Sequence, residues 1–342
     1  MFQTFSISSM AFYEAIVAPV FADRTGSALN YNGTLNEFTV MNNVVSSRTI
    51  VDIRRAQNIM QRRDASCDII YKNLFGATTR KISVEEIYGA VKFCRNEFYQ
   101  GCLKEFRSKD PLFGRKILPY FKAAMATDLT TNSYFGDVTR IVPSTYAFST
   151  DIYDGVFKWI KRYTTSSVIP AAQTIAIADG TNYTTTPSAA FDLIKAMYDK
   201  MPVLMKTFTN DQLAYYVSAE IAEGYEDYMI AAGSGNTAYT NDVMNGITRR
   251  LAYKGIPILV EPLWTPVITE LKGAAGYAAV LTIRGNFIFG TDKTYGEGED
   301  GTTALEVWYD KEFMTWKYRM FLKAGTQIAL PEFIVYALSA WT

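Results

Sequence analysis

The last quarter of the chain, from Arg250 to Leu338, places the tightest limits on the fold, because strand and turn signals follow one another there in a clear order. A turn and strand at Tyr253–Pro262 are followed by the apolar run Ala279–Ile283, a turn at Arg284 and a second apolar run at Phe287–Asp292. Short apolar runs bounded by glycine, proline and polar residues are typical of buried strands. This region is therefore predicted to be rich in β-structure.

A longer strand is predicted after these runs, because apolar and charged residues alternate there with the period of two that marks a half-buried strand. Trp316, Tyr318, Met320 and Leu322 fall on one face, and Lys317, Arg319 and Lys323 fall on the other. The chain closes with an apolar segment from Leu330 to Leu338.

Two pairs of a capping residue and a proline predict helices. Asp110 and Pro111 begin a helix of roughly 20 residues, about 30 Å long, which ends before Gly136. Its apolar face is Leu112, Ile117, Leu118, Phe121, Met125 and Leu129. Thr186 and Pro187 begin another helix.

The segments around these helices alternate between strand and helix signals, which is typical of an α+β chain. Strands are predicted at Val203–Phe208 and Leu213–Val217, and Ser218 is predicted to cap a helix. Residues 79–107 are predicted to form a strand that feeds a helix. Short helices are expected around residues 9–17 and 154–163.

The composition argues against most catalytic chemistry. The chain has no histidine in 342 residues, and its 34 acidic residues balance its 34 basic ones. Histidine is the usual general base and the commonest metal ligand, so most hydrolase triads and most zinc enzymes are disfavoured. We predict no catalytic residue, no cofactor and no metal.

The cysteines and the apolar runs bear on the compartment. Cys67, Cys94 and Cys102 are odd in number and match no zinc spacing, so we interpret them as reduced and buried. No apolar run reaches the length of a membrane span, and the N-terminus has no signal-peptide pattern. A soluble protein without a membrane partner is expected.

An arginine-rich segment from Ser47 to Asp68 is the main candidate for an interaction site. Its arginines are Arg48, Arg54, Arg55, Arg62 and Arg63. They predict a projecting element that meets acidic partners, although one solvated face of the chain is an equally good interpretation. Because aromatic residues are not interleaved and the net charge is zero, the pattern is a poor nucleic-acid signature.

Two loops resemble ligand-binding loops but lack the residues or the spacing that such sites require. The loop Gly233–Asn236 lacks the lysine of a phosphate-binding P-loop and follows a helix rather than a strand. The acidic turn Tyr295–Gly301 lacks the spacing of a calcium loop and is interpreted as a solvated hairpin tip.

Taken together, the order of elements resembles the major capsid proteins of tailed bacteriophages, which have the Hong Kong 97 fold. The resemblance rests on the loop that starts near Arg48, the helix that ends in the glycine-aspartate turn Tyr134–Asp137, and the strands at 254–258, 287–292 and 303–324. It implies an N-terminal arm (1–46), an extended loop (47–80), a first part of a peripheral domain (81–144) with a spine helix (110–132), an axial domain (145–265) and a second peripheral part (266–342).

The resemblance also implies a function and partners. The chain would assemble as hexamers and pentamers into an icosahedral head around double-stranded DNA, which it would touch only weakly and without sequence preference. It would meet portal, scaffolding and decoration proteins, reside in the virion capsid and assemble in the cytoplasm of the bacterial host. Since only about 46 residues precede the loop, we expect a separate scaffolding protein or none. The five arginines would then lie at a subunit interface.

Two other functions stay open from the sequence. One is the shell of an encapsulin-like nanocompartment, which would enclose protein cargo in place of a genome. The other is a cytoplasmic α+β enzyme that uses acidic residues such as Asp179, Glu220 or Glu223. The enzyme would need these carboxylates to converge in a concave site.

Overall fold

The computed structural model describes residues 4–6, 38–55, 75–94, 111–143, 146–232, 239–240, 250–292, 306–310, 312 and 315–340 of the chain. Its helices are α3 (Pro111–Phe135), α4 (Val156–Thr165), α5 (Pro187–Asp199), α6 (Ala219–Ala231) and α7 (Trp264–Lys272), with single 3₁₀ turns at η5 (Ala171–Gln173), η6 (Met205–Thr207), η7 (Asn210–Gln212) and η9 (Pro331–Phe333). Its strands are β1 (Thr4–Ser6), β2 (Phe38–Met41), β3 (Ser47–Arg55), β4 (Phe75–Ser83), β5 (Glu85–Cys94), β6 (Thr174–Ala176), β7 (Leu213–Ser218), β8 (Tyr239–Thr240), β9 (Arg250–Tyr253), β10 (Ile256–Glu261), β11 (Ala278–Ile283), β12 (Phe287–Thr291), β13 (Glu306–Asp310), β14 (Thr315–Ile328) and β15 (Ile334–Leu338).

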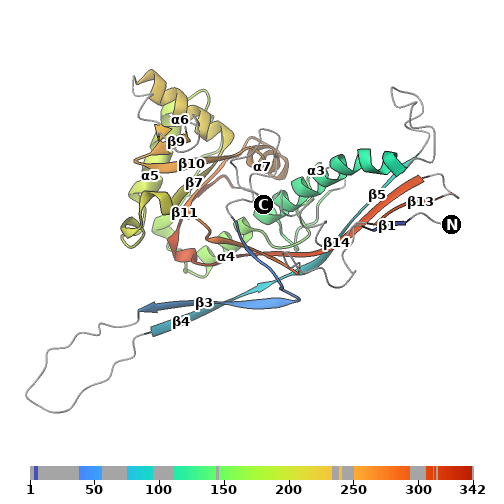
Figure 1. Ribbon diagram of the computed structural model, residues 1–342. Coiled ribbons are helices and arrows are strands. Elements are labelled where there is room, and N and C mark those ends of the chain that lie inside the picture. The colour runs from blue at the N-terminus through green and yellow to red at the C-terminus, as the bar shows by residue number, and fades with distance from the viewer. Residues whose placement is uncertain are drawn as a thin grey trace, which may run out of the picture.

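The first sheet is built around the long strand β14. Within the described residues its order is β1-β13-β14-β12-β2, and β5 is a further partner of β14. Residues 315–324 of β14 pair with β5, and residues 324–328 pair with β12. Tyr318 and Leu322 are buried and Arg319 is exposed, which confirms the predicted alternation at these positions. Figure 1 shows β14 running along the underside of α3.

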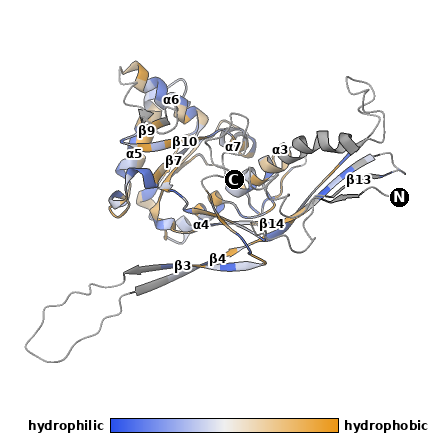
Figure 2. Ribbon diagram, viewed as in Figure 1, coloured by the Kyte–Doolittle hydropathy of each residue, from blue (hydrophilic) through white to orange (hydrophobic). Residues whose placement is uncertain are grey.

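The second sheet has the order β6-β15-β11-β7-β10-β9-β8 among the described strands. Its centre is covered on both faces, as expected for strands that consist mostly of continuous apolar runs. Leu213, Tyr215 and Val217 of β7 pack with α5 and α6 on one face, and Ala214 and Tyr216 pack with α7 on the other. Figure 2 shows apolar residues along β7 and β10 and hydrophilic ones on the outer helices.

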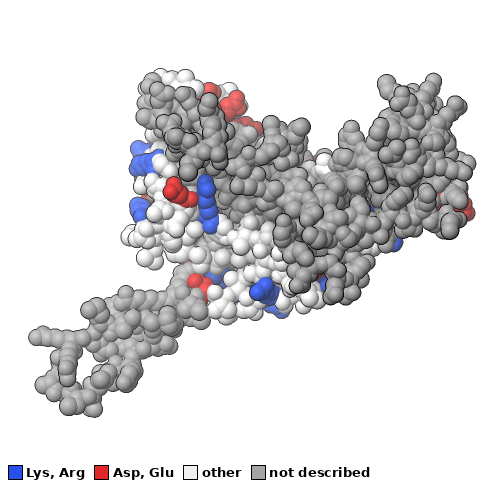
Figure 3. Space-filling view, viewed as in Figure 1, with Lys and Arg blue, Asp and Glu red and all other residues white. Residues whose placement is uncertain are grey.

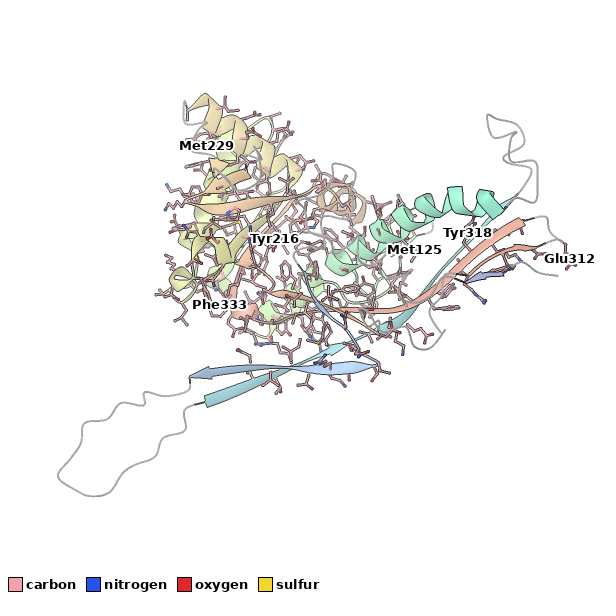
Figure 4. The ribbon with its side chains drawn as sticks, in the orientation of Figure 1. Met125, Tyr216, Met229, Glu312, Tyr318 and Phe333 are labelled. Atoms are coloured by element: carbon pink, nitrogen blue, oxygen red, sulfur yellow. The ribbon has the colours of Figure 1, made fainter. Side chains whose placement is uncertain are left out.

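The spine helix α3 lies over the first sheet. It has 25 residues, so it spans about 37 Å at 1.5 Å per residue. Met125 and Leu129, two positions of the predicted apolar face, are buried in the same core as Tyr318 and Leu322 of β14. Figure 4 shows Met125 and Tyr318 in the layer between the helix and the sheet.

The tight turn between β9 and β10 forms where the sequence predicted it. Lys254 and Gly255 both have positive φ angles, of 49° and 81°, a region that glycine adopts without strain. The side chain of Asn210 donates a hydrogen bond to the carbonyl of Lys254, with a distance of 3.0 Å. Ile256 then begins β10.

The strand predicted at Val203–Phe208 is wrong, because this segment contains the 3₁₀ turn η6. Val203 and Leu204 are 80% and 65% exposed, whereas Met205 is fully buried. A half-buried strand would alternate buried and exposed residues, but here two exposed residues are followed by one buried residue, Met205. Pro202 accepts hydrogen bonds from Met205 and Lys206, and these bonds close the turn.

Two further predictions are only partly met. The strand predicted at the start of residues 79–107 is present and continues as β5 to Cys94, and the helix expected after it lies outside the described residues. Ser218 precedes α6 as predicted, but its hydroxyl group makes no capping bond. It bonds instead to the backbone N–H and carbonyl of Ala278 in β11. The short helix expected around residues 9–17, together with Cys67 and Cys102, also lies outside the described residues.

Candidate subunit interface

The β3–β4 hairpin is the candidate interface, because it leaves the body of the molecule. Its strands pair from Ser47 opposite Ser83 to Arg55 opposite Phe75, and this sheet has no third strand among the described residues. Figure 1 shows the hairpin projecting below the two sheets. Val51 is 54% exposed on it. A two-stranded hairpin alone in water is marginally stable, so this element gains stability if another surface covers it.

Three of the five candidate arginines lie on this hairpin. Arg48 is exposed at the start of β3, and its guanidinium donates a 3.4 Å hydrogen bond to the carbonyl of Asn42. Arg54 and Arg55 occupy the last two positions of β3, farthest from the base. Arg62 and Arg63 lie outside the described residues.

The base of the hairpin crosses the first sheet over two glycines that face each other. Gly290 of β12 is paired with Gly325 of β14. Ile82 is fully buried, and a Cβ atom added at Gly290 would lie 2.9 Å from its Cδ1. A Cβ atom at Gly325 would meet the backbone of Ser83. Glycine in a strand interior often marks such a close approach of another backbone.

Polar contacts hold the same base from the side. The Arg80 guanidinium donates to the carbonyl of Ala329 at 2.6 Å and lies 3.4 Å from a carboxylate oxygen of Glu332. The Gln327 side chain donates to the carbonyl of Lys81 at 2.9 Å and accepts a bond from the Tyr163 hydroxyl at 2.9 Å. The hairpin is thus joined to β14, to η9 and to α4.

The glycine-aspartate turn after α3 is a second organised feature. A Cβ atom at Gly136 would meet the carbonyl of Tyr153, so the chain between the two helices packs directly on the turn. The Asn132 side chain donates to the carbonyls of Asp128 and Ser149 and accepts from the N–H of Ile152. These bonds fix the segment that leads into α4 against the end of α3.

Ion pairs stabilise this turn. Lys158 of α4 lies 2.6 Å from carboxylate oxygens of both Asp137 and Asp154. Burial alone would raise the pKa of Asp137, but hydrogen bonds from Lys158 and Thr139 outweigh burial and lower this pKa to about 2. The Asp137 carboxylate is therefore a structural anion with a fixed partner.

The carboxylates considered for an enzyme do not converge. Asp179 pairs with Lys272 at 2.5 Å, and Glu220 accepts a hydrogen bond from Thr265. Thr265 and Lys272 lie nearly two turns apart on α7, while Glu223 is exposed on α6.

Two further features are absent from the described residues. These residues hold no group of three or more cysteine, aspartate or glutamate side chains that could bind a metal ion. No helix among them combines the length and the apolar character that a membrane span requires. The loops at 233–236 and 295–301 lie outside the described residues.

Comparisons with known proteins find similarity in fold to solved structures. No family model matches the sequence, and no curated protein matches it. Among solved structures, a chain of the satellite phage P4 procapsid with its size determination protein aligns with a TM-score of 0.54 and 11% identity, over 89% of this chain and 94% of that one. A chain of the Ralstonia phage GP4 capsid aligns with a TM-score of 0.50 and 9% identity, over 90% and 87%.

An encapsulin is also among the similar structures. A chain of the holo-SrpI encapsulin complex from Synechococcus elongatus aligns with a TM-score of 0.51 and 9% identity, over 94% of both chains. At such low identity the agreement concerns the fold, and it covers nearly the whole length of each partner. The projecting hairpin, the long helix over a sheet built on β14 and the second, helix-covered sheet together form the Hong Kong 97-like fold that the sequence resembled.

Proposed function

We propose that this chain is the major capsid protein of a tailed bacteriophage. It is a structural subunit that assembles as hexamers and pentamers into an icosahedral head around double-stranded DNA. The observation that supports the proposal most directly is the hairpin, which leaves the body of a fold shared with phage procapsid and capsid chains. Its role is mechanical rather than catalytic.

The shape of the subunit favours assembly with copies of itself. A hairpin that projects past its own body can lie on a neighbour, and the neighbour's hairpin can lie on the next subunit. Such head-to-tail contacts close into rings when the rotation between subunits is right. Rings of flat subunits can then tile a closed shell.

The arginines of the hairpin segment are proposed to lie at this interface. Arg48, Arg54, Arg55, Arg62 and Arg63 would meet acidic positions of adjacent subunits. Exposed ion pairs add little net stability, so their main effect would be to select the register between subunits and to speed encounter.

We propose the domain layout that the resemblance implies, with an arm at 1–46, a loop at 47–80, peripheral parts at 81–144 and 266–342, and an axial domain at 145–265. β11 and β15 follow residue 265, yet they pair within the sheet that contains β7 and β10. The axial and peripheral parts would therefore share a continuous sheet and move together.

Other partners follow from this role. Portal, scaffolding and decoration proteins would bind the shell, and the genome would be touched weakly. Among the described residues on the face that Figure 3 shows, basic and acidic side chains are interspersed, which suits weak contact with DNA better than tight binding. The protein would reside in the virion capsid after assembly in the cytoplasm of the bacterial host.

Particle size tests the proposal. The purified chain, alone and with candidate scaffolding proteins, is passed through a sizing column and viewed by negative-stain electron microscopy. Closed particles of megadalton mass are expected. A compact monomer at every concentration, with and without the scaffolding proteins, would contradict it.

An encapsulin-like compartment is the second candidate, favoured by the alignment with the encapsulin chain over 94% of both proteins. The contents of particles purified from the native source separate the two. Nuclease-protected double-stranded DNA supports the phage head. A protein enclosed without nucleic acid supports the compartment.

A further inference from the structure

Each of the last four residues of β4 contacts the body, and Lys81 does so through its carbonyl, which accepts a hydrogen bond from the Gln327 side chain. Ile82 is fully buried against Gly290, and the backbone of Ser83 lies on Gly325. Two residues farther out, Arg80 reaches the carbonyl of Ala329. Thr78 and Thr79, the next residues outward, are exposed.

The contacts of Ile82 and Ser83 act as a pivot. Ile82 and Ser83 are consecutive, so the apolar contact and the glycine contact lie close together and fix where β4 crosses the sheet. A single small contact region resists translation better than rotation. By itself it would leave the hairpin free to tilt.

Arg80 is placed to oppose that tilt. It is about 7 Å beyond Ile82 along the strand, at about 3.4 Å per residue. Its side chain is 11% exposed, and it contacts both the end of β14 through Ala329 and the first residues of η9 through Glu332. Hydrogen bonds from a charged donor in a partly buried site are among the stronger ones in proteins.

The contacts of Arg80 also extend into the body. The Gln173 side chain donates to the carbonyl of Glu332 at 3.0 Å. Gln327, which contacts Lys81, is bonded to Tyr163 of α4. Through these bonds the base of the hairpin is connected to α4, to η9 and, through η9, to β15. The body therefore fixes the angle of the hairpin.

We propose that Arg80 is a positioning residue for assembly, which holds the hairpin at a fixed angle so that its distal half reaches the neighbouring copy of this chain. This inference rests on the proposed function. It assigns to Arg80 a role different from that of the interface arginines, because Arg80 contacts its own chain.

Two readouts on the full-length chain test it. Amide hydrogen exchange is measured on Arg80→Gln, on the conservative Arg80→Lys and on Lys81→Gln. Lys81 is exposed and adjacent to Arg80, so Lys81→Gln removes one positive charge without removing the contacts of Arg80 with Ala329 and Glu332. Particle yield and the spread of particle diameters are then measured for each variant.

Arg80→Gln is expected to speed exchange of the hairpin amides at 47–55 and 75–80 by about tenfold or more, with exchange in β7 and β11 unchanged. Its particles should be fewer and more variable in diameter. Arg80→Lys should give an intermediate result, and Lys81→Gln should match the wild type.

The outcomes separate this inference from the function on which it rests. Unchanged amide exchange of the hairpin in Arg80→Gln would overturn the proposal that Arg80 holds the hairpin, whether or not particles form. Faster exchange with particles as uniform as those of Lys81→Gln would overturn its role in assembly. Wild-type protein that forms no particles would overturn the proposed function and the assembly role together, while the exchange data would still decide whether Arg80 holds the hairpin.

Discussion

Replacing Gly325 with alanine tests the crossing of the hairpin over the first sheet. An added Cβ atom would lie 2.0 Å from the carbonyl oxygen of Ser83 and 3.0 Å from its carbonyl carbon. Ordinary contacts of this kind begin at 3.4 Å, so one backbone has to move by about 1.4 Å. No side-chain rotation relieves the clash, because both contacting atoms belong to the main chain.

The expected loss is large for a single methyl group. Overpacking a well-filled site costs about 1–3 kcal/mol and occasionally more. Here Gly325 is paired with Gly290 in β12, so a shift of β14 also disturbs that pairing. We expect Gly325→Ala to lower the free energy of unfolding by about 3 kcal/mol.

Gly290→Ala provides the matched comparison, because its added Cβ atom would meet a side chain instead of a backbone. The nearest atom is Cδ1 of Ile82 at 2.9 Å, which can shift, so a loss of about 1 kcal/mol is expected. Ile82→Val removes that Cδ1 atom and costs about 1 kcal/mol by itself. The double variant should lose about 0.5–1 kcal/mol less than the sum of the two single variants.

Urea unfolding of unassembled subunits, followed by tryptophan fluorescence, measures the stability of the wild type and of all four variants. The expected order of stability is wild type, then Gly290→Ala, then Gly325→Ala. A Gly325→Ala protein within about 0.5 kcal/mol of the wild type, a change typical of an ordinary surface substitution, would refute the close crossing. Strict additivity of Gly290→Ala and Ile82→Val would refute their contact.

Three further predictions concern the interface and the core. Charge reversal of Arg54 and Arg55 should reduce shell assembly and alter its dependence on salt, as measured by light scattering; normal shells with unchanged salt sensitivity would remove these residues from the interface. Because hydrogen bonds lower the pKa of Asp137 from its ordinary value of 3.8 to about 2, the stability it contributes is fully present above about pH 4 and is lost as the pH falls toward 2. In thermal melts, Asp137→Asn should be less stable than the wild type near neutrality and should lose less stability over that pH range. Tyr153→Phe removes a buried hydroxyl that bonds to the end of α3 and should cost about 1–2 kcal/mol. Tyr215→Phe removes a buried hydroxyl that has no hydrogen-bond partner among the described residues, and it should be neutral or stabilising in the same unfolding assay.

Local chemistry was enough to predict the elements that begin with a strong signal. Pro111 and Pro187 each occupy the first position of a helix, where the missing N–H of proline costs nothing. The turn at Lys254 and Gly255 and the alternation in β14 were found in the same way. In these segments the information lies within a few residues of the element itself.

Predictions were incomplete or wrong where the residue types of a segment do not decide its contacts. Ser218 has the residue type and the position of a helix cap, but its hydroxyl bonds to Ala278, sixty residues away. At Val203–Phe208 the apolar composition suits a strand, and only the exposure of Val203 and Leu204 reveals a turn. A short apolar run does not by itself distinguish the two structures.

The attachment of the hairpin base to the first sheet was not predicted, although the sequence contains one signal for it. Gly290 and Gly325 stand inside apolar strand patterns, where glycine is unfavourable unless something approaches closely. What approaches them is β4, which is more than two hundred residues away from either glycine in the sequence. The glycines could have been marked as a crossing point, but the strand that crosses there is set by the tertiary fold.

The position of this crossing explains how one hairpin can be part of the buried core at its base and exposed farther out. Ile82 is fully buried while Val51, on the other strand of the same hairpin, is 54% exposed, so the hairpin changes from core to surface along its own length. Its inner end draws stability from the first sheet, whereas a two-stranded hairpin without other support, as at its outer end, is only marginally stable. If the proposed function holds, the outer end should be the part whose hydrogen-exchange protection rises most when particles form, because a neighbouring subunit would cover it there.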